Sequence, residues 1–370
     1  MTAPFRFNRP TRRQLIAAFG MGLLASGMIS ACTGSKNTAG TNATGESPAA
    51  TTPAATTAAA NKQPVELTLV SYAVTRAAYE KIIPLFVEKW QKEHGQTVKI
   101  NQSYGGSGSQ TRAVIDGLEA DVVALALAQD VEKIEDAKLI DAGWEAEAPN
   151  GAIVHKSVAA LVTRPGNPKG IKDWQDLAKP GVKVITANPK TSGGARWNFL
   201  VLWGAVTETG GTPAAAESFV KSVYGNVPIL PRDAREATDV FLKQGQGDVL
   251  INYENELLLA KDKGQKLDYV VPETNISIDS PVAVVDKNVD KHGTREVAEA
   301  FVKFLYTPEA QKAFGEAGFR PIDPAVEAQF SGKFGKVTKL FTAKEFGGWD
   351  AIQKQFFADG AIFDKIQTKR

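Results

Sequence analysis

Strand-like and helix-like segments alternate along this chain from about residue 64 to its end. Residues 66–72 (ELTLVSY) predict a strand, and residues 76–91 predict a helix because large apolar side chains recur at steps of three and four. Residues 121–128 (DVVALALA) are apolar on both faces, as in a buried parallel strand. Further strands are predicted over 97–102, 158–163, 182–186, 248–253, 267–271 and 281–285, with helices over 110–118, 171–177, 196–206, 234–243, 254–263, 296–306, 308–316 and 344–357.

This alternation predicts an α/β fold with mostly parallel sheets flanked by helices. The alternating region is too long for one ordinary core, so we expect two lobes. Open parallel sheets bind ligands beyond the carboxyl ends of their strands, where loops lead into helices. The loops after the strands are therefore the expected place for a site.

The first 31 residues look like an export signal rather than part of the fold. They contain four arginines and no acidic residue, followed by an apolar run over residues 15–29. This anatomy predicts a cleaved signal peptide. The pair Arg12-Arg13 resembles a twin-arginine signal, although an ordinary basic leader has the same charge.

Cys32 is the only cysteine and follows Ile29-Ser30-Ala31, which resembles a bacterial lipobox. A lipidated Cys32 would tie the protein to a membrane face, whereas the bland alternative is an incidental thiol. Residues 33–63 are rich in Thr, Ala, Asn, Gly and Pro and have no aromatic residue, which predicts a flexible tether.

Charge and residue counts exclude several classes of protein. The full chain carries 43 basic and 41 acidic residues, and loss of the four leader arginines leaves a slight negative excess, so a nucleic-acid binder is not expected. One cysteine excludes an internal disulfide framework. The three histidines are far apart in sequence, and we expect them on the surface, with no metal site and no cofactor.

Four loops combine glycine or small residues with a helix start, at residues 72–76, 105–110, 191–197 and 233–238. Helix N-termini present unpaired N–H groups and a partial positive charge, so they bind anions. Ordinary capping explains any one such loop. The occurrence of several such loops, each at the end of a predicted strand, favours an anion-binding site.

Seven motifs follow one another in a fixed order along the chain. They are SYAVTR (71–76), GGSG (105–108), DVV (121–123), GNPK (166–169), NPKTSGGARW (188–197), GDVLI (247–251) and FGGW (346–349). In these motifs, and over residues 65–370, the chain resembles prokaryotic periplasmic sulfate-binding proteins, the receptors of sulfate/thiosulfate ABC importers. The second glycine of Gly193-Gly194 favours the sulfate branch.

The resemblance implies a periplasmic-binding-protein fold whose two lobes close on a dehydrated sulfate. It assigns the hydroxyl of Ser192 as a donor and places Tyr253 where the family has a tryptophan; Ala73 stands where the family has an aspartate. It implies no catalytic residue, no metal and no nucleic acid, and its partners are sulfate and the permease subunits of an importer. The chain is expected to be a periplasmic monomer. The implied backbone donors are Ala73, Ser107, Gly193, Gly194 and Ala234.

The domain organisation that we expect follows from the same reasoning, with other ligand classes kept open. A thiosulfate, phosphate or molybdate receptor differs only in pocket details. A secreted serine hydrolase with Ser107 or Ser192 as nucleophile would need a nearby general base. The expected parts are a signal peptide (1–31), Cys32 with the linker (32–63), a first lobe (64–150 and 255–320), a second lobe (151–254) and C-terminal helices (321–370), possibly on the second lobe.

Overall fold

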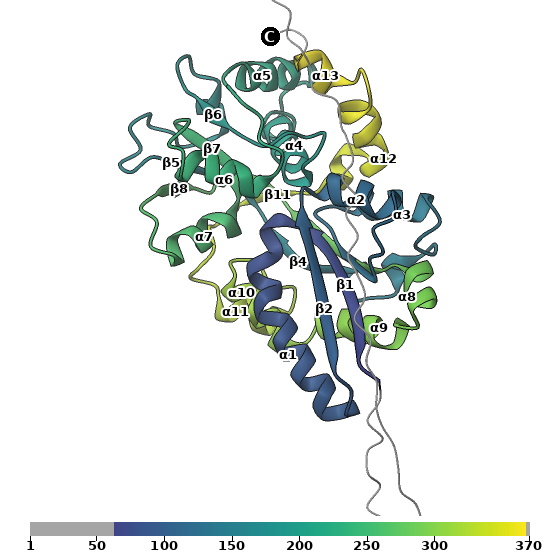
Figure 1. The fold of residues 1–370 in the computed structure, drawn as a ribbon. Helices are drawn as coiled ribbons and strands as arrows, with labels where there is room; N and C mark the ends of the chain where they lie inside the picture. The colour runs from purple at the N-terminus through teal and green to yellow at the C-terminus, as the bar shows by residue number, and fades with distance from the viewer. Residues whose placement is uncertain (1–62, 368–370) are drawn as a thin grey trace, which may run out of the picture. The chain divides into compact units, whose positions relative to one another are not determined.

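The computed structural model describes residues 63–367, which form two β-sheets and a two-stranded ribbon with helices packed on them (Figure 1). The predicted signal peptide, Cys32 and the linker up to residue 62 lie outside the described residues. None of the helices in the described part has the length and apolar character needed to span a membrane.

The five-stranded sheet has the order β2-β1-β3-β10-β4. β1 runs parallel to β2 and β3, whereas β10 runs antiparallel to β3 and β4. Its strands are β1 (Val65–Tyr72), β2 (Val98–Gly105), β3 (Val122–Ala124), β4 (Ile153–Ser157) and β10 (Ile278–Val284).

Both faces of this sheet are buried, because alternate side chains enter two different cores. Leu67 and Leu69 share a core with side chains of α1, α9 and α10, and Val70 and Val123 share another with α2, α3 and η2. The elements around this sheet are η1 (Ala73–Thr75), α1 (Arg76–His94), α2 (Ser107–Ile115), α3 (Ala128–Asp136), η2 (Trp144–Ala146), α8 (Asp286–His292), α9 (Arg295–Phe304) and α10 (Pro308–Glu316).

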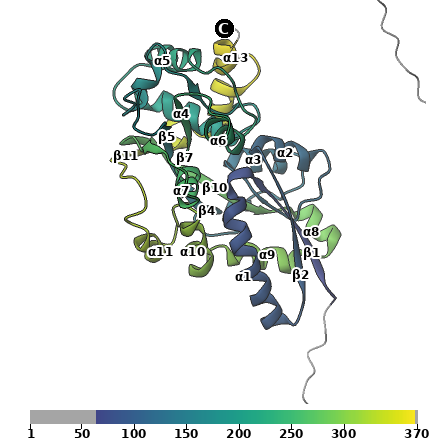
Figure 2. The ribbon, with the colours of Figure 1, turned by 60° about the vertical axis from the view of Figure 1, so that its left-hand side comes forward.

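The four-stranded sheet has the order β6-β7-β5-β8, with α6 and α7 against one face and α4 and α5 against the other (Figure 2). Phe199 and Tyr224 are among the large buried side chains on the α4–α5 side. The elements are β5 (Ala159–Thr163), η3 (Trp174–Ala178), β6 (Val184–Ile185), α4 (Gly193–Thr207), α5 (Pro213–Gly225), α6 (Ala234–Leu242), β7 (Val249–Tyr253), α7 (Glu254–Asp262) and β8 (Asp268–Val270).

The α/β fold with helix-flanked sheets is as predicted, and each sheet is mixed because one strand runs against the others. In the five-stranded sheet this strand is β10, and in the four-stranded sheet it is β5, which is antiparallel to both β7 and β8. A parallel pair needs a crossover connection. The reversed strands β5 and β10 directly follow β4 and β9, which belong to other sheets, and are not reached through a crossover helix.

The chain crosses between the sheets at Val158 and again between β8 and β10. The predicted lobe boundaries stay a prediction, but β8 lies beyond residue 254 and still pairs with β5. The segment from 255 to 270 therefore belongs structurally with the four-stranded sheet. The ribbon that follows pairs β9 (Thr274–Ile276) with β11 (Lys339–Phe341), and α11 (Pro324–Gln329) precedes β11.

The C-terminal helices lie against α4 and α5 (Figure 1). Phe356 packs on Phe199, and Phe363 packs on Tyr224. The single helix predicted over 344–357 is instead broken, because Gly347 and Gly348 both have φ of 84°. The pieces are η4 (Ala343–Phe346), α12 (Trp349–Ile352), the π-helical turn η5 (Gln353–Phe357) and α13 (Ile362–Gln367).

One histidine is not on the surface as expected. His155, on β4, is 1% exposed and packs against Phe314 and Phe319, so burial lowers its pKa to about 3. The charged neighbour Lys156 favours an exposed stretch, but alternate residues of a strand face opposite sides, so His155 can be buried beside it.

The buried His155 makes stability pH-dependent. Its pKa is lower in the folded chain than in the unfolded chain, so the unfolded chain binds more protons below about pH 6.5. The free energy of unfolding should therefore fall as pH drops, by up to about 1.4 kcal/mol per pH unit from this group alone. Urea unfolding of the wild type and of His155→Phe between pH 4 and 7 checks this. A variant that keeps the full slope would contradict it.

Candidate anion-binding site

The seven residues predicted to contact a ligand all line one small cavity between the two sheets. Ala73 and Ser107 follow β1 and β2 of the five-stranded sheet, and the other five belong to the side of the four-stranded sheet. The cavity is narrow, with about 180 Å³ of empty space that is partly open to solvent. Its size suits a small ion. Contact with a ligand stays a prediction. The five are Ser192, Gly193, Gly194, Ala234 and Tyr253.

Several helices begin at this cavity. α2 begins at Ser107 and α4 at Gly193, each three residues earlier than predicted, and α6 begins at Ala234. Ser107, Gly193 and Gly194 are therefore first-turn residues, whose N–H groups have no partner within the helix, and Ser192 is the N-cap of α4. η1 and α7 also begin here, at Ala73 and Glu254. The positive ends of helix dipoles thus converge on one small volume.

The two sides of the cavity approach so closely that side chains would not fit. A Cβ on Gly193 would lie 2.7 Å from the Cβ of Ala126 on the opposite side. A Cβ on Gly106 would lie 2.5 Å from the carbonyl oxygen of Thr191. Glycine at these positions lets the two backbones meet, so the structure represents a closed cleft.

The two serines use their hydroxyls differently. The Ser192 oxygen accepts a 3.3 Å hydrogen bond from the Ala195 N–H, which caps α4 and leaves its proton available for a ligand. The Ser107 hydroxyl donates to Asp130 Oδ2 at 2.6 Å and accepts from the Ala126 N–H at 3.0 Å. Ser107 therefore offers the cavity its backbone N–H rather than its hydroxyl.

Tyr253 carries a buried hydroxyl for which no hydrogen-bond partner is found within residues 63–367. That oxygen would lie 2.9 Å from a Cβ on Gly194, which places it against the first turn of α4. Burial raises the phenol pKa well above its ordinary value, so the group keeps its proton and can only be satisfied by donating or accepting. This hydroxyl is therefore a polar group beside the cavity that could donate to a ligand.

Charged side chains near the cavity are occupied by other protein groups. Asp233 lines the cavity, but its Oδ1 caps α6 by accepting from the Glu236 N–H at 2.9 Å. Arg235 pairs with the buried Glu256 at 2.6 Å, and burial raises the pKa of that carboxyl despite the arginine. Arg235 Nε has no partner among the described residues, but Arg235 does not line the cavity, so the donors that line it are neutral. The other two arginines of these loops are also engaged, Arg196 with Gln129 and Asp130, and Arg76 over the ring of Tyr104.

Sequence reasoning missed Ala126, which completes the cavity wall. It follows β3, so the rule that sites lie beyond strand ends pointed to it. The carbonyl oxygen of Ala126 accepts a 2.8 Å hydrogen bond from the indole Nε1 of Trp197. This indole N–H is therefore not available to bind a ligand. The remaining unpredicted lining residues are Tyr72, Val74, Gly105, Gly106 and Asp233.

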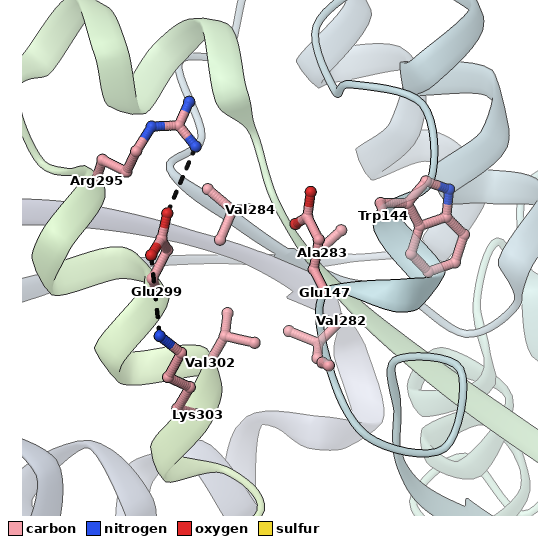
Figure 3. Close-up of a pocket in the computed structure, with 10 residues that line it drawn as sticks. Trp144, Glu147, Val282, Ala283, Val284, Arg295, Glu299, Val302 and Lys303 are labelled. Atoms are coloured by element: carbon pink, nitrogen blue, oxygen red, sulfur yellow. Dashed lines mark ion pairs between the residues drawn. The ribbon is translucent and has the colours of Figure 1, made fainter.

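A larger cavity lies elsewhere, between β10, α9 and the loop after η2 (Figure 3). It has about 720 Å³ of empty space, partly open to solvent, with a floor that includes Val282 and Val284. Its cations are paired, since Glu299 lies 3.6 Å from Arg295 and 4.0 Å from Lys303. It does not offer the free donors of the smaller cavity. No group of side chains suited to a metal ion occurs among residues 63–367.

An α/β chain with an ion-sized cavity between two sheets is built as a solute-binding protein. The family model for bacterial extracellular solute-binding proteins matches residues 67–320. The chain belongs to this family, whose members are receptors and not enzymes, as expected from the sequence. The family description also agrees with the expected location outside the cytoplasm.

The relatives of the chain within this family confirm the resemblance. A sulfate-binding protein from Synechococcus elongatus is 63% identical over 306 residues, which cover 82% of this chain and 87% of the relative. One from Escherichia coli is 46% identical over 309 residues, covering 82% and 94%. The structure of the sulfate-binding protein SubI from Mycobacterium tuberculosis matches with a TM-score of 0.74 at 39% identity, covering 80% of this chain and 100% of that one.

Proposed function

We propose that this protein is an extracytoplasmic receptor that binds sulfate and delivers it to an ABC-type importer. The observation that carries the proposal is the small cavity between the two sheets, at which α2, α4 and α6 begin with their first-turn N–H groups. The names of its relatives point to the same ligand.

The donor set suits an anion that has no proton. Sulfate is fully ionised at neutral pH, so each of its oxygens accepts and none donates. Amide and hydroxyl donors satisfy it, and helix dipoles balance its charge without a bound cation. Hydrogen phosphate would turn a proton toward another donor, which leaves a buried polar group unpaired at a cost of about 1–3 kcal/mol. The cavity therefore favours sulfate over phosphate.

Titration calorimetry of the mature protein with sulfate, thiosulfate, phosphate and molybdate tests this proposal. We expect tight 1:1 binding of sulfate and much weaker binding of phosphate. Tighter binding of thiosulfate would make the protein a receptor of the other branch. Absence of sulfate binding would refute the proposal.

The hydrolase alternative finds no support in the contacts of either serine. Ser107 bonds to Asp130 and to the Ala126 N–H, and Ser192 to the Ala195 N–H, so neither is paired with a histidine among the described residues. The buried His155 instead packs among aromatic rings. Nucleophilic catalysis requires a base within reach of the hydroxyl.

We also propose that the leader is cleaved before Cys32 and that Cys32 is lipidated. The support is its position, as the only cysteine, directly after Ile29-Ser30-Ala31. Residues 33–63 would then act as a tether between a membrane anchor and a monomeric receptor. Mass spectrometry of the membrane fraction should find acyl chains on the N-terminal peptide. A Cys32→Ser chain found in the same fraction would contradict the anchor.

Ser192 is expected to affect both binding and stability. In Ser192→Ala the ligand loses a hydroxyl donor and α4 loses its cap. The affinity for sulfate should fall about tenfold, because a water molecule can fill the small space and donate in its place. The free energy of unfolding should fall by about 1 kcal/mol.

Thr212→Ala is the matched control, because Thr212 caps α5 in the same way, through the Ala215 N–H at 3.2 Å, and does not line the cavity. Calorimetry and urea unfolding of both variants check the prediction. If Thr212→Ala weakened sulfate binding as much as Ser192→Ala, the assignment of Ser192 as a donor would fail.

A further inference from the structure

Two residues flank the point where the chain first crosses between the sheets. Lys156 belongs to β4 of the five-stranded sheet, and Val158 immediately precedes β5 of the four-stranded sheet. Lys156 exchanges two backbone hydrogen bonds with Arg320, of 2.9 and 2.8 Å, which form an isolated antiparallel bridge. The backbone of Arg320 is therefore fixed to the five-stranded side of the crossing.

The backbone of Glu254 is fixed to the other side of the crossing. Its N–H donates to the carbonyl oxygen of Val158 at 2.9 Å, and it directly follows Tyr253 of the cavity. The side chains of Arg320 and Glu254 then meet in a two-point ion pair, with Nε to Oε2 at 2.8 Å and Nη2 to Oε1 at 3.1 Å. Together these contacts form a closed ring around the crossing, through Lys156, Arg320, Glu254 and Val158.

The carboxylate of this ion pair is buried, whereas the Arg320 side chain is 19% exposed. Glu254 is 0% exposed, and its Oε1 also accepts from the Gly335 N–H at 2.6 Å. Arg320 Nη2 donates to the Gly335 carbonyl oxygen at 2.7 Å. A Cβ on Gly335 would lie 2.5 Å from a side-chain carbon of Val271, so Gly335, which bonds to both Arg320 and Glu254, is itself closely packed. A two-point ion pair with a buried carboxylate holds a defined geometry.

A rotation of one sheet against the other would change this ring. Hinge closure of a binding protein turns a few residues at the crossing between its two parts. Such a rotation moves Arg320 with Lys156 and moves Glu254 with Val158. A planar two-point pair tolerates little displacement. The pair is intact in the present arrangement, which the approach of Gly193 to Ala126 identifies as closed.

We infer that Arg320 is a positioning residue, whose ion pair with Glu254 braces the two sheets in the closed arrangement and slows release of the bound anion. This inference rests on the proposed function. The ion pair makes no predicted contact with the ligand, because Arg320 and Glu254 do not line the small cavity. Loss of the brace should therefore change how long the cleft stays closed rather than how the ligand is recognised.

Stopped-flow measurement of sulfate association and dissociation tests the brace. Arg320→Gln should raise the dissociation rate about tenfold with little change in the association rate. Arg320→Lys, which keeps the charge but not the planar fork, should lie between this variant and the wild type. Arg295→Gln is the control, because it breaks pairs with Asp286 and Asp290 that lie within one side of the molecule. An unchanged dissociation rate in Arg320→Gln, or an equal rise in Arg295→Gln, would overturn the inference.

A second measurement tests, without any ligand, whether the ion pair holds the two sheets in the closed arrangement. Spin labels on Glu80→Cys of α1 and Lys221→Cys of α5, both exposed, in a Cys32→Ser chain report the distance between the two sides. In the sulfate-free protein, Arg320→Gln should shift the distances away from the shortest ones, and Arg295→Gln should not. Identical distributions in Arg320→Gln and the unmodified chain would refute the brace. Failure of the wild type to bind sulfate would refute the proposed function alone.

Discussion

Sulfate binding is expected to be lost when Gly193 is replaced by aspartate. The new Cβ would lie 2.7 Å from the Cβ of Ala126, so the cleft could not close as it does in the wild type. The carboxylate would also stand at the first turn of α4, where the helix N-terminus would bind it in place of the anion. Steric exclusion and repulsion between like charges together predict a loss of affinity of about a thousandfold or more.

Gly332→Asp is the control for the added charge. Gly332 is exposed, and a Cβ there would meet no atom within 4 Å. Titration calorimetry should find wild-type affinity in this variant and no measurable binding in Gly193→Asp, while circular dichroism shows both to be folded. Wild-type affinity in Gly193→Asp would mean that the anion binds elsewhere.

Tyr253→Phe should weaken binding and stabilise the empty protein at the same time. The phenol hydroxyl is buried and has no partner among the described residues, so its removal should raise the free energy of unfolding by about 1 kcal/mol. With sulfate present, the variant loses a hydrogen bond to a charged acceptor, about 1.5–3 kcal/mol, or about 10- to 150-fold in affinity. A phenylalanine ring would leave little room for a water molecule to replace the donor.

Tyr79→Phe separates the two effects. Tyr79 is also fully buried, and its hydroxyl also has no partner within the described residues, but it packs between Phe301 and Phe314 rather than at the cavity. Its loss should stabilise the protein and leave the affinity for sulfate unchanged. If Tyr253→Phe behaved like Tyr79→Phe in calorimetry, Tyr253 would not be a ligand donor.

Much of the site could be predicted because it is built from local features. Gly193 and Ser192 sit in a ten-residue motif, and the first turn of a helix determines where their N–H and hydroxyl groups point. The predicted starts of α2 and α4 lie three residues too late, because glycine and serine in a first turn resemble loop residues in sequence. The close approach of Ala126 to Gly193 across the cavity depends on tertiary packing. The one sequence signal for Ala126 is its position just after a predicted strand.

The sheets were harder to predict than the site. Strand direction depends on how the chain passes between the sheets, and the apolar pattern of β10 is the same whichever way it runs. The burial of His155 and the pairing of Arg320 with Glu254 also depend on segments far apart in sequence. The ring at the crossing joins residues 156, 158, 254 and 320, which no local pattern brings together.

The groups offered by the cavity, amides and hydroxyls, hold their protons across the range in which cells live. Loading the receptor should therefore take up no hydrogen ions and release none, and the heat of binding should be the same in buffers of different ionisation enthalpy. The affinity for the anion should therefore be the same in acidic and in alkaline solution. The pH range over which the protein binds would be set by the stability of its fold and not by the protonation of the site.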